Sequence, residues 1–330
     1  MPIVTTEHFK NGNLPQSKNG IPQVSDDDYY RLRGYKLEKD DIVFSRVGSI
    51  DINAHVEQSQ QGWLFSGRVL RVRPIKSVNS LCLHYILSTE SVKRSIRNRA
   101  VGQTMPSINT PILSNTKINI PQSVVEQKKI ANLLALLDKR IAIQNKIIDK
   151  LQSLIKGISK QLLMNNQNWR TVRIGELLRI GNGKDYKHLG IGKIPVYGTG
   201  GQMLLVNDYL YDGESVCIGR KGTIDKPMFL KGKFWTVDTL FYTYDFKDVL
   251  PKFCYYLFLQ INWKLYNEGT GVPSLSKSTI ENIKVKIPSI EQQHNICSVL
   301  DCYEHKTKSE EQILELYLSE KQYLLRQMFI

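Results

Sequence analysis

The clearest pattern of apolar and polar positions lies mid-chain, where apolar residues recur at alternating steps of four and three. Gln144 fills one polar position in a series formed otherwise by Ile130, Leu134, Leu137, Ile141, Ile148, Leu151, Ile155, Ile158 and Leu162. Such a heptad repeat is the seam of a coiled coil. It predicts a helix over residues 126–163, which would be about 55 Å long at 1.5 Å per residue.

A weaker version of this seam recurs 166 residues later and predicts a second long helix. Polar residues interrupt it, and its apolar and aromatic members are Ile296, Leu300, Tyr303, Leu314, Tyr317, Leu324 and Met328. We expect some of its contacts to shift toward Ile313 and Leu316. Neither helix has an apolar face wide enough for a buried core helix, so we expect the two to pair. Chain connectivity then predicts an antiparallel pair with a domain at each end.

The repeat extends beyond the helices, because the chain contains two diverged copies of one pattern. Residues 46–51 match residues 220–225 at an offset of 174, and residues 106–108 match residues 273–275 at an offset of 167. The offsets drift in one direction, as small loop deletions would produce. A pseudo-two-fold internal repeat is therefore predicted.

Each copy begins with a segment rich in glycine, aromatic and β-branched residues, which favours short strands and turns. Strands are predicted at residues 42–44 and 216–218, and again at 117–120 and 283–287, where a proline ends each strand. The predicted class is α+β, with mixed α/β domains separated by the helices. The expected divisions are residues 1–121, 122–164, 165–287 and 288–330.

The charge of the chain points to an anionic partner. The formal net charge is +14 and the isoelectric point about 9.4. Release of counterions from phosphates drives the binding of such surfaces to nucleic acid, although a soluble basic protein would also fit.

Membrane insertion and disulfide bonding are not expected. The first 20 residues are polar, and no run approaches the roughly 18 apolar residues that span a membrane. The five cysteines form no Cys-x-x-Cys pair, which favours reduced thiols and a cytoplasmic location.

The motifs, in their order, resemble those of the specificity (S) subunit of type I restriction–modification systems. The resemblance rests on residues 169–177, which look like the opening of a target recognition domain, on the block at 194–201, and on the Gly-Arg-Lys-Gly-Thr loop at 219–223. It also rests on the Ile-Pro pairs at 120–121 and 287–288, each followed by a helix start at 126–131 or 291–293. The resemblance covers nearly the whole chain.

The first copy departs from the family pattern. Residues 2–6 look like the block around Pro195, so copy one has no counterpart of residues 165–193. Its recognition domain is predicted to be short, either by nature or because the chain starts inside a longer ancestral gene.

The resemblance implies a subunit without chemistry of its own. Each recognition domain would read half of a bipartite target in double-stranded DNA. The helices would bind two methyltransferase (M) subunits, and restriction (R) subunits would join. S-adenosylmethionine, ATP and magnesium would belong to those partners, and no cofactor or metal is expected on this chain.

Candidate DNA-binding residues are basic, aromatic, amide or hydroxyl side chains near glycine-rich loops or on predicted strands. Arginine can bond guanine edges bidentately, and glycine allows close approach to phosphate. The candidates are Arg46, Arg71, Arg73, Lys184, Lys187, Tyr197, Gln202, Arg220, Lys221, Lys231, Lys233 and Thr270. Each candidate could instead be a residue without a binding role, on a solvated turn or strand face or, for Tyr197, in the core.

Catalytic signals are scarce. The chain has no adenine-methyltransferase tetrad, no phosphate-binding Gly-x-x-x-x-Gly-Lys-Ser/Thr loop and no zinc-type histidine spacing. A stand-alone nuclease or methyltransferase with fused recognition domains remains the alternative, and a structural coiled-coil protein is a third possibility.

Overall fold

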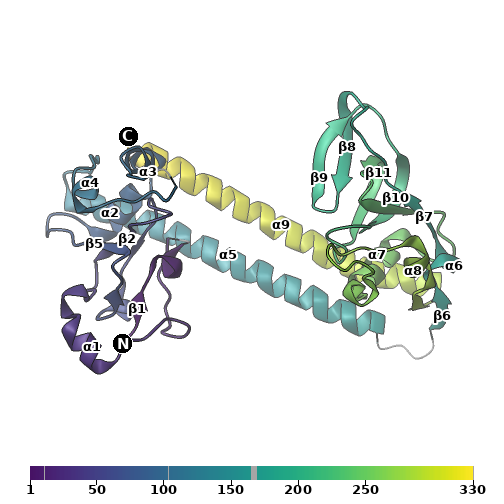
Figure 1. Cartoon of the computed structure of the whole chain (residues 1–330), viewed down its shortest axis with the longest axis horizontal. Helices are drawn as coiled ribbons and strands as arrows, with labels where there is room; N and C mark the ends of the chain where they lie inside the picture. Colours follow the sequence, from purple (N-terminus) through teal and green to yellow (C-terminus); the bar gives the residue numbers. More distant parts are fainter. Residues whose placement is uncertain (11, 103, 165–168, 330) are drawn as a thin grey trace. The chain divides into compact units, whose positions relative to one another are not determined.

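A computed structural model describes residues 1–10, 12–102, 104–164 and 169–329 (Figure 1). The predicted domain boundary at residue 165 lies outside these residues, and so does Gln103. The chain divides into two compact units. Unit 1 comprises Met1–Asn145 and Gln312–Ile330, and unit 2 comprises Lys146–Glu311.

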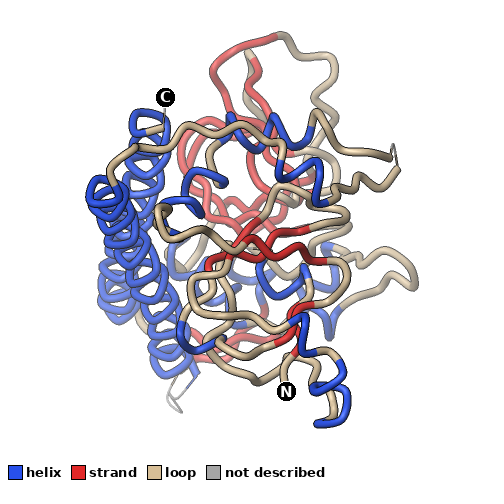
Figure 2. The backbone as a smooth tube through the Cα atoms, turned by 90° about the vertical axis from the view of Figure 1, so that its left-hand side faces the viewer, coloured by secondary structure: helices blue, strands red, loops and turns tan. Residues whose placement is uncertain are grey.

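The two heptad segments form the long helices α5 (Val124–Met164) and α9 (Ile290–Met328). In unit 1, Leu134 of α5 shares an apolar cluster with Leu325 of α9, and Asp138 forms an ion pair with Lys321 at 2.5 Å. Further along α5, Arg140 lies over the ring of Tyr317. Rising numbers in α5 meet falling numbers in α9, so the helices pack antiparallel, as predicted (drawn in blue in Figure 2).

Unit 2 holds the other parts of the same helices. Leu163 of α5 lies in one core cluster with Ile296 and Leu300 of α9. All the apolar and aromatic positions of the two predicted seams are buried or half-buried. Ile313 and Leu316 are exposed, however, so the expected shift of contacts toward them was wrong.

A buried glutamine fixes the start of each long helix. In unit 1, Gln127 accepts a hydrogen bond from the Asn79 backbone at 2.7 Å and donates one to the Pro121 carbonyl at 2.8 Å. In unit 2, Gln293 accepts from the Leu250 backbone at 2.8 Å. It donates to the carbonyls of Asp248 at 3.0 Å and Pro288 at 3.1 Å. Each side chain satisfies backbone groups where a helix leaves its domain.

Unit 2 contains a six-stranded sheet in the order β7-β12-β10-β11-β8-β9. Only the β11–β8 pair is parallel. The strands are β7 (Arg179–Asn182), β8 (Ile191–Gly198), β9 (Gly201–Val206), β10 (Tyr211–Gly219), β11 (Met228–Thr236) and β12 (Leu240–Tyr244). A separate antiparallel pair joins β6 (Arg170–Arg173) to β13 (Lys284–Ile287).

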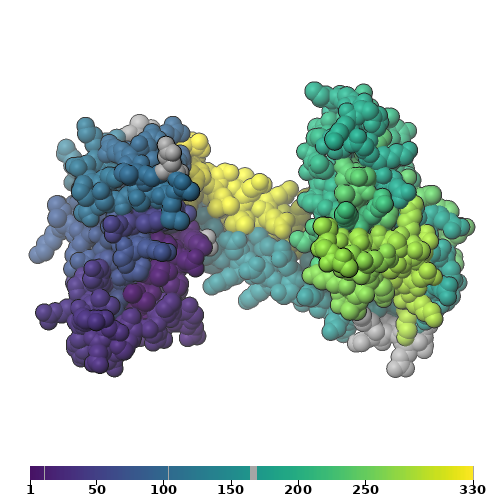
Figure 3. Space-filling model, viewed as in Figure 1, coloured from purple at the N-terminus to yellow at the C-terminus, as the bar shows by residue number. Residues whose placement is uncertain are grey.

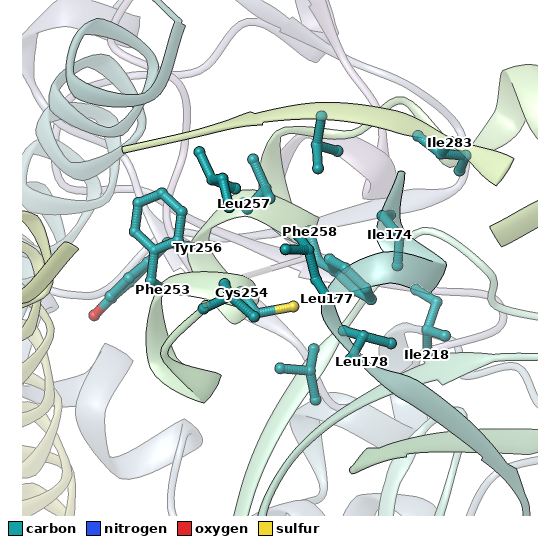
Figure 4. Close-up of a cluster of buried hydrophobic side chains, with 14 of the residues drawn as sticks. Ile174, Leu177, Leu178, Ile218, Phe253, Cys254, Tyr256, Leu257, Phe258 and Ile283 are labelled. Atoms are coloured by element: carbon teal, nitrogen blue, oxygen red, sulfur yellow. The ribbon is translucent and has the colours of Figure 1, made fainter. Parts of the chain in front are cut away.

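The core of unit 2 lies between the sheet and its helices. Apolar side chains from α7 (Pro251–Gln260), such as Phe253 and Phe258, meet Leu177 of α6 (Ile174–Leu177) and Ile218 of β10 (Figure 4). The remaining helices are α8 (Lys277–Asn282) and a 3-10 turn at Trp263–Tyr266.

Unit 1 is built on smaller sheets. The strands β3 (Asn53–His55), β2 (Ile42–Ser45) and β5 (Val69–Val72) form an antiparallel sheet, and β1 (Ile3–Val4) pairs in parallel with β4 (Leu64–Phe65). The helices are α1 (Asp26–Arg31), α2 (Ser80–Leu87), α3 (Glu90–Arg97) and α4 (Thr110–Ser114). Short 3-10 turns occupy Thr6–Phe9, Arg33–Tyr35 and Gln58–Gln60.

One predicted strand does not form. Residues 117–120 pair with no other strand, whereas the matching β13 pairs with β6. Strand β6 belongs to the segment that has no counterpart in the first copy. Without that partner the backbone of residues 117–120 has no ladder to join.

Candidate nucleic-acid interface

The loop that follows β10 is held by backbone hydrogen bonds on two sides. The Arg220 N–H donates to the Thr239 carbonyl at 2.8 Å, and the Arg220 carbonyl accepts from Leu275 at 2.9 Å. The Gly222 N–H donates to the Pro273 carbonyl at 2.8 Å. Gly222 has φ +94°, which favours glycine, and a Cβ on Gly219 would lie 2.1 Å from the Thr223 carbonyl oxygen. The glycines therefore shape a fixed loop that presents Arg220 and Lys221.

The two cations border an open recess of about 450 Å³ in unit 2. The guanidinium of Arg220 lies 5.9 Å from the Phe241 ring centroid, within cation–π range. The recess is lined by Asn182, Arg220, Lys221, Phe241, Glu268, Ser274, Leu275, Ser276 and Lys277. Three of these side chains are cationic and one is acidic. Hydrogen bonds from Thr279 and Ser276 hold the pKa of Glu268 below its usual range.

Other candidates gather around this loop. Lys184 follows β7, and its N–H donates to the Thr236 carbonyl at 2.9 Å. Thr236 is also the strand partner of Tyr197, which pairs across the β8–β9 hairpin with Gln202. A Cβ built on Gly222 would lie 3.8 Å from Thr199 Oγ1, so the turn of that hairpin adjoins the Arg220 loop.

Thr270 lies exposed in the neighbouring loop that also contains Pro273. Asn267 closes this loop, because its side-chain oxygen accepts from the Gly269 N–H at 3.0 Å and from the Ser274 N–H at 2.8 Å. Thr270 is thus carried on a braced loop beside the recess.

The remaining basic candidates of unit 2 have other contacts. Lys231 forms an ion pair with Glu214 at 3.0 Å, and Lys233 lies over the ring of Tyr209 at 4.7 Å. Lys187 is exposed, and its backbone N–H donates to the Asp185 side chain at 3.4 Å. No hydrogen bond or ion pair in the described part of unit 2 joins these three lysines to the Arg220 loop.

Unit 1 repeats the backbone of the loop around Arg46. The Arg46 N–H donates to the Arg68 carbonyl at 3.0 Å, and its carbonyl accepts from Ile108 at 2.9 Å. The Gly48 N–H donates to the Pro106 carbonyl at 2.9 Å, and Gly48 has φ +81°. The Arg46 side chain donates to the Gly67 carbonyl at 3.2 Å and stays exposed.

The other two candidates in unit 1 support its fold. Arg73 donates two hydrogen bonds, of 2.7 and 2.8 Å, to the buried carboxylate of Asp41. Hydrogen bonding to Asp41 raises the pKa of Arg73 above its usual value. Arg71 donates to the Lys36 carbonyl at 2.7 Å and lies over the Phe65 ring. Breaking the Arg73 pair would leave Asp41 charged and buried, which is costly.

Some residues of the site escape sequence reasoning. Lys277 lines the recess, yet it lies in no basic run or repeated motif, and Asn182 was predicted only as part of a basic loop with Lys184 and Lys187. The only signal for Gln127 and Gln293 was their recurrence at the same helix start in both copies. Within the described residues, no group of His, Cys, Asp or Glu side chains could hold a metal ion, and no helix is long and apolar enough to cross a membrane.

Comparison with known proteins agrees with this architecture. A family model described as "Type I restriction modification DNA specificity domain" matches residues 1–153 and 166–316. The chain belongs to this family. It is a specificity subunit of a type I restriction–modification complex and hence a non-catalytic component of that complex. The prediction of a non-enzymatic subunit is confirmed.

Two relatives indicate the degree of similarity. The putative type I restriction enzyme MjaX specificity subunit of Methanocaldococcus jannaschii is 26% identical, over 94% of this chain and 83% of the relative. The EcoprrI specificity subunit of Escherichia coli is 25% identical over 35% of this chain and 29% of its own length.

Solved structures show the same fold at low identity. The S subunit of a type I system from M. genitalium has a TM-score of 0.67 and 17% identity, covering 99% of this chain and 91% of that one. A chain from a study of type I system assembly and conformational transition has a TM-score of 0.59 and 13% identity, covering 88% and 82%.

Proposed function

We propose that the two units read the two halves of a bipartite target in double-stranded DNA, and that the long helices bind two M subunits and set the spacer between the half-sites. The R subunits join this assembly. S-adenosylmethionine, ATP and magnesium serve the partner subunits, and the complex acts in the cytoplasm.

One observation carries this proposal, namely the arginine loop that both units build with equivalent backbone hydrogen bonds. Arg46 and Arg220 each follow a buried strand and precede a positive-φ glycine bonded to a proline carbonyl. Repetition of a presented cation on a braced loop fits two readers of similar design. Guanidinium groups suit both phosphates and guanine edges.

Unit 2 offers the fuller contact set. We assign DNA contact there to Arg220, Lys221, Lys184, Tyr197, Gln202 and Thr270, and we add Asn182 and Lys277 of the recess. Lys187, Lys231 and Lys233 would add phosphate contacts at its margin. In unit 1 we assign contact to Arg46 and give Arg71 and Arg73 a supporting role, because their guanidinium groups bond other parts of unit 1.

The test is purification of the chain with M subunits, followed by sequencing of methylated sites in DNA exposed to the complex. A bipartite, asymmetric adenine-methylation motif is expected. Arg220→Ala should weaken affinity for one half-site by about 1–3 kcal/mol, and Arg46→Ala should affect the other half. Lys286→Ala, which removes one exposed charge from β13, is the matched control.

A methylated motif without a gap would contradict the bipartite reading. An unchanged motif and rate in Arg220→Ala, with Lys286→Ala equally silent, would remove the arginine loop from the interface.

A further inference from the structure

The β8–β9 hairpin of unit 2 has an unusual surface for a strand pair in a folded domain. Three consecutive apolar residues of β9 are open to solvent, with exposed fractions of 54% for Met203, 36% for Leu204 and 45% for Leu205. Side chains of neighbouring strand residues point to opposite faces. Exposure of both Leu204 and Leu205 therefore means that this strand is covered on neither face.

The hairpin stands out from unit 2 in Figure 1, and its residues form a projecting ridge in the space-filling view of Figure 3. Strand β9 is the edge of the six-stranded sheet. Only Val206, at the end of β9, is buried there, in a cluster with Val196, Trp235 and Val237. The hairpin is thus joined to the sheet through β8, and β9 forms its outer edge.

An exposed apolar edge strand invites pairing with another strand unless something prevents it. The β8–β9 ladder has two register shifts, one between Ile191 and Ile194 and one between Val196 and Tyr197. Such irregularities twist an edge and disfavour strand addition. A protein with a flat surface would cover only one face of the hairpin. A partner with a groove that receives the hairpin would cover both faces and therefore fits the exposure of β9 better.

The composition and position of the hairpin favour DNA as that partner. Residues 191–206 contain one cation, Lys193, and no acidic residue, so they do not repel phosphates. The turn of the hairpin adjoins Gly222 of the arginine loop. The DNA major groove is about 12 Å wide and admits a two-stranded ribbon, whereas the minor groove is about 6 Å wide.

We infer that the β8–β9 hairpin enters the major groove of the half-site read by unit 2, where exposed apolar residues of β9, Leu205 among them, contact thymine C5 methyl groups. This inference rests on the proposed function. Apolar contact with the thymine methyl is one of the means by which proteins distinguish A·T from other pairs. The hairpin would then supply sequence discrimination, and the neighbouring cations would hold the backbone.

The described residues of unit 1 form no equivalent ribbon. Its strand β1 pairs in parallel with β4, as β8 does with β11, but β1 is followed by the 3-10 turn at Thr6–Phe9 instead of a second strand. The inference therefore concerns one half-site, and the other serves as an internal control.

The experiment compares the wild-type complex with Leu205→Ser and with Leu259→Ser, each assembled with M subunits. Leu259 lies on α7 and is 43% exposed, so its loss matches that of Leu205 in size and exposure. The methylated motif is determined for all three, and affinity is measured on duplexes in which single thymines of the target are replaced by uracil, which lacks the methyl group.

We expect Leu205→Ser to relax the motif in one half only and Leu259→Ser to leave it unchanged. At least one uracil substitution in that half should weaken wild-type binding roughly tenfold, within the range of a single mismatched pair. The same substitution should have little further effect on Leu205→Ser. In the half-site affected by Arg46→Ala, uracil substitution should have the same effect on wild-type and Leu205→Ser complexes.

Several outcomes would overturn the inference while leaving the proposed function intact. These are an unchanged motif in Leu205→Ser, no sensitivity to uracil, a unit 2 half-site without A·T pairs, or a change only in oligomeric state or M-subunit binding. Absence of any sequence-specific methylation by the wild-type complex would instead reject the proposed function.

Discussion

Units 1 and 2 share the backbone arrangement of the arginine loop and differ in the side chains and strands that surround it. Three hydrogen bonds around Arg46 have equivalents around Arg220, within 0.2 Å in length. Yet Lys221 corresponds to Val47, and the strands β6, β7 and β9 of unit 2 have no counterpart among the described residues of unit 1. The shared arrangement depends on glycine and proline positions, which tolerate little change. The surrounding side chains carry no such constraint, so the two readers can diverge in sequence preference.

The same contrast holds where the long helices pack against their domains. Each unit has a tyrosine that donates to an aspartate, Tyr85 to Asp138 at 2.8 Å and Tyr256 to Asp301 at 2.6 Å. The associated cation differs in origin. In unit 1 it is Lys321 of α9, and in unit 2 it is Lys252 of α7. Equivalent electrostatic clusters have therefore been completed from different elements.

The strongest test of the features shared by both units concerns the buried glutamines. Gln293→Ala should destabilise the start of α9 by about 3 kcal/mol and Gln127→Ala the start of α5 by about 2 kcal/mol, because the variants lose three and two hydrogen bonds of a buried side chain, respectively. Hydrogen–deuterium exchange of each helix start measures this. Their exposed counterparts, Gln292→Ala and Gln122→Ala, should change little, and equal effects in buried and exposed variants would contradict the anchoring role.

The two units should differ in how their stability depends on pH. Burial, reinforced by the nearby His55, Lys321 and Lys93, lowers the pKa of His84 in unit 1 to about 3, and its Nδ1 lies 2.7 Å from Asn53 Oδ1. Below pH 6.5 the unfolded chain takes up a proton on this group and the folded chain does not. Stability is therefore lost as pH falls from about 6.5 toward 3, by about 2 kcal/mol at pH 5.

Denaturant unfolding at pH 7.5 and pH 5 measures this loss. The variant His84→Gln should show a flatter pH dependence, since it removes the titrating ring. An identical slope in the variant would assign the acid sensitivity to other groups. Unit 2 has Tyr255 at the matching position, so no such loss is expected from it.

The smallest expected difference concerns the two lysines. Lys252 contacts both Glu304 at 2.8 Å and Asp301 at 3.4 Å, whereas Lys321 contacts Asp138. We expect Lys252→Met to cost about 1.5 kcal/mol and Lys321→Met about 1 kcal/mol, since all three ion pairs are only partly buried. Thermal unfolding in low and high salt provides the measurement. Effects that grow with salt would argue against ion pairing.

Sequence reasoning succeeded where the physical cause is local and periodic. The heptads predicted both long helices, chain connectivity predicted their antiparallel packing, and β-branched runs predicted β2 and part of β10. It failed at residues 117–120, because strand formation there depends on a partner that the first copy lacks. The ion pair of Arg73 joins residues 32 positions apart and leaves no local pattern. The apolar run of β9 resembles core sequence, and only the edge position of that strand reveals its exposure.

The path of the chain has a genetic consequence. Unit 2 is one uninterrupted segment, Lys146–Glu311, whereas unit 1 is assembled from two segments that flank it, so each long helix contains one junction between units. Two crossovers, one inside each helix-coding region, would transplant an entire reader together with the helix portions that belong to its own core. New combinations of half-sites could then arise by recombination without redesign of either core.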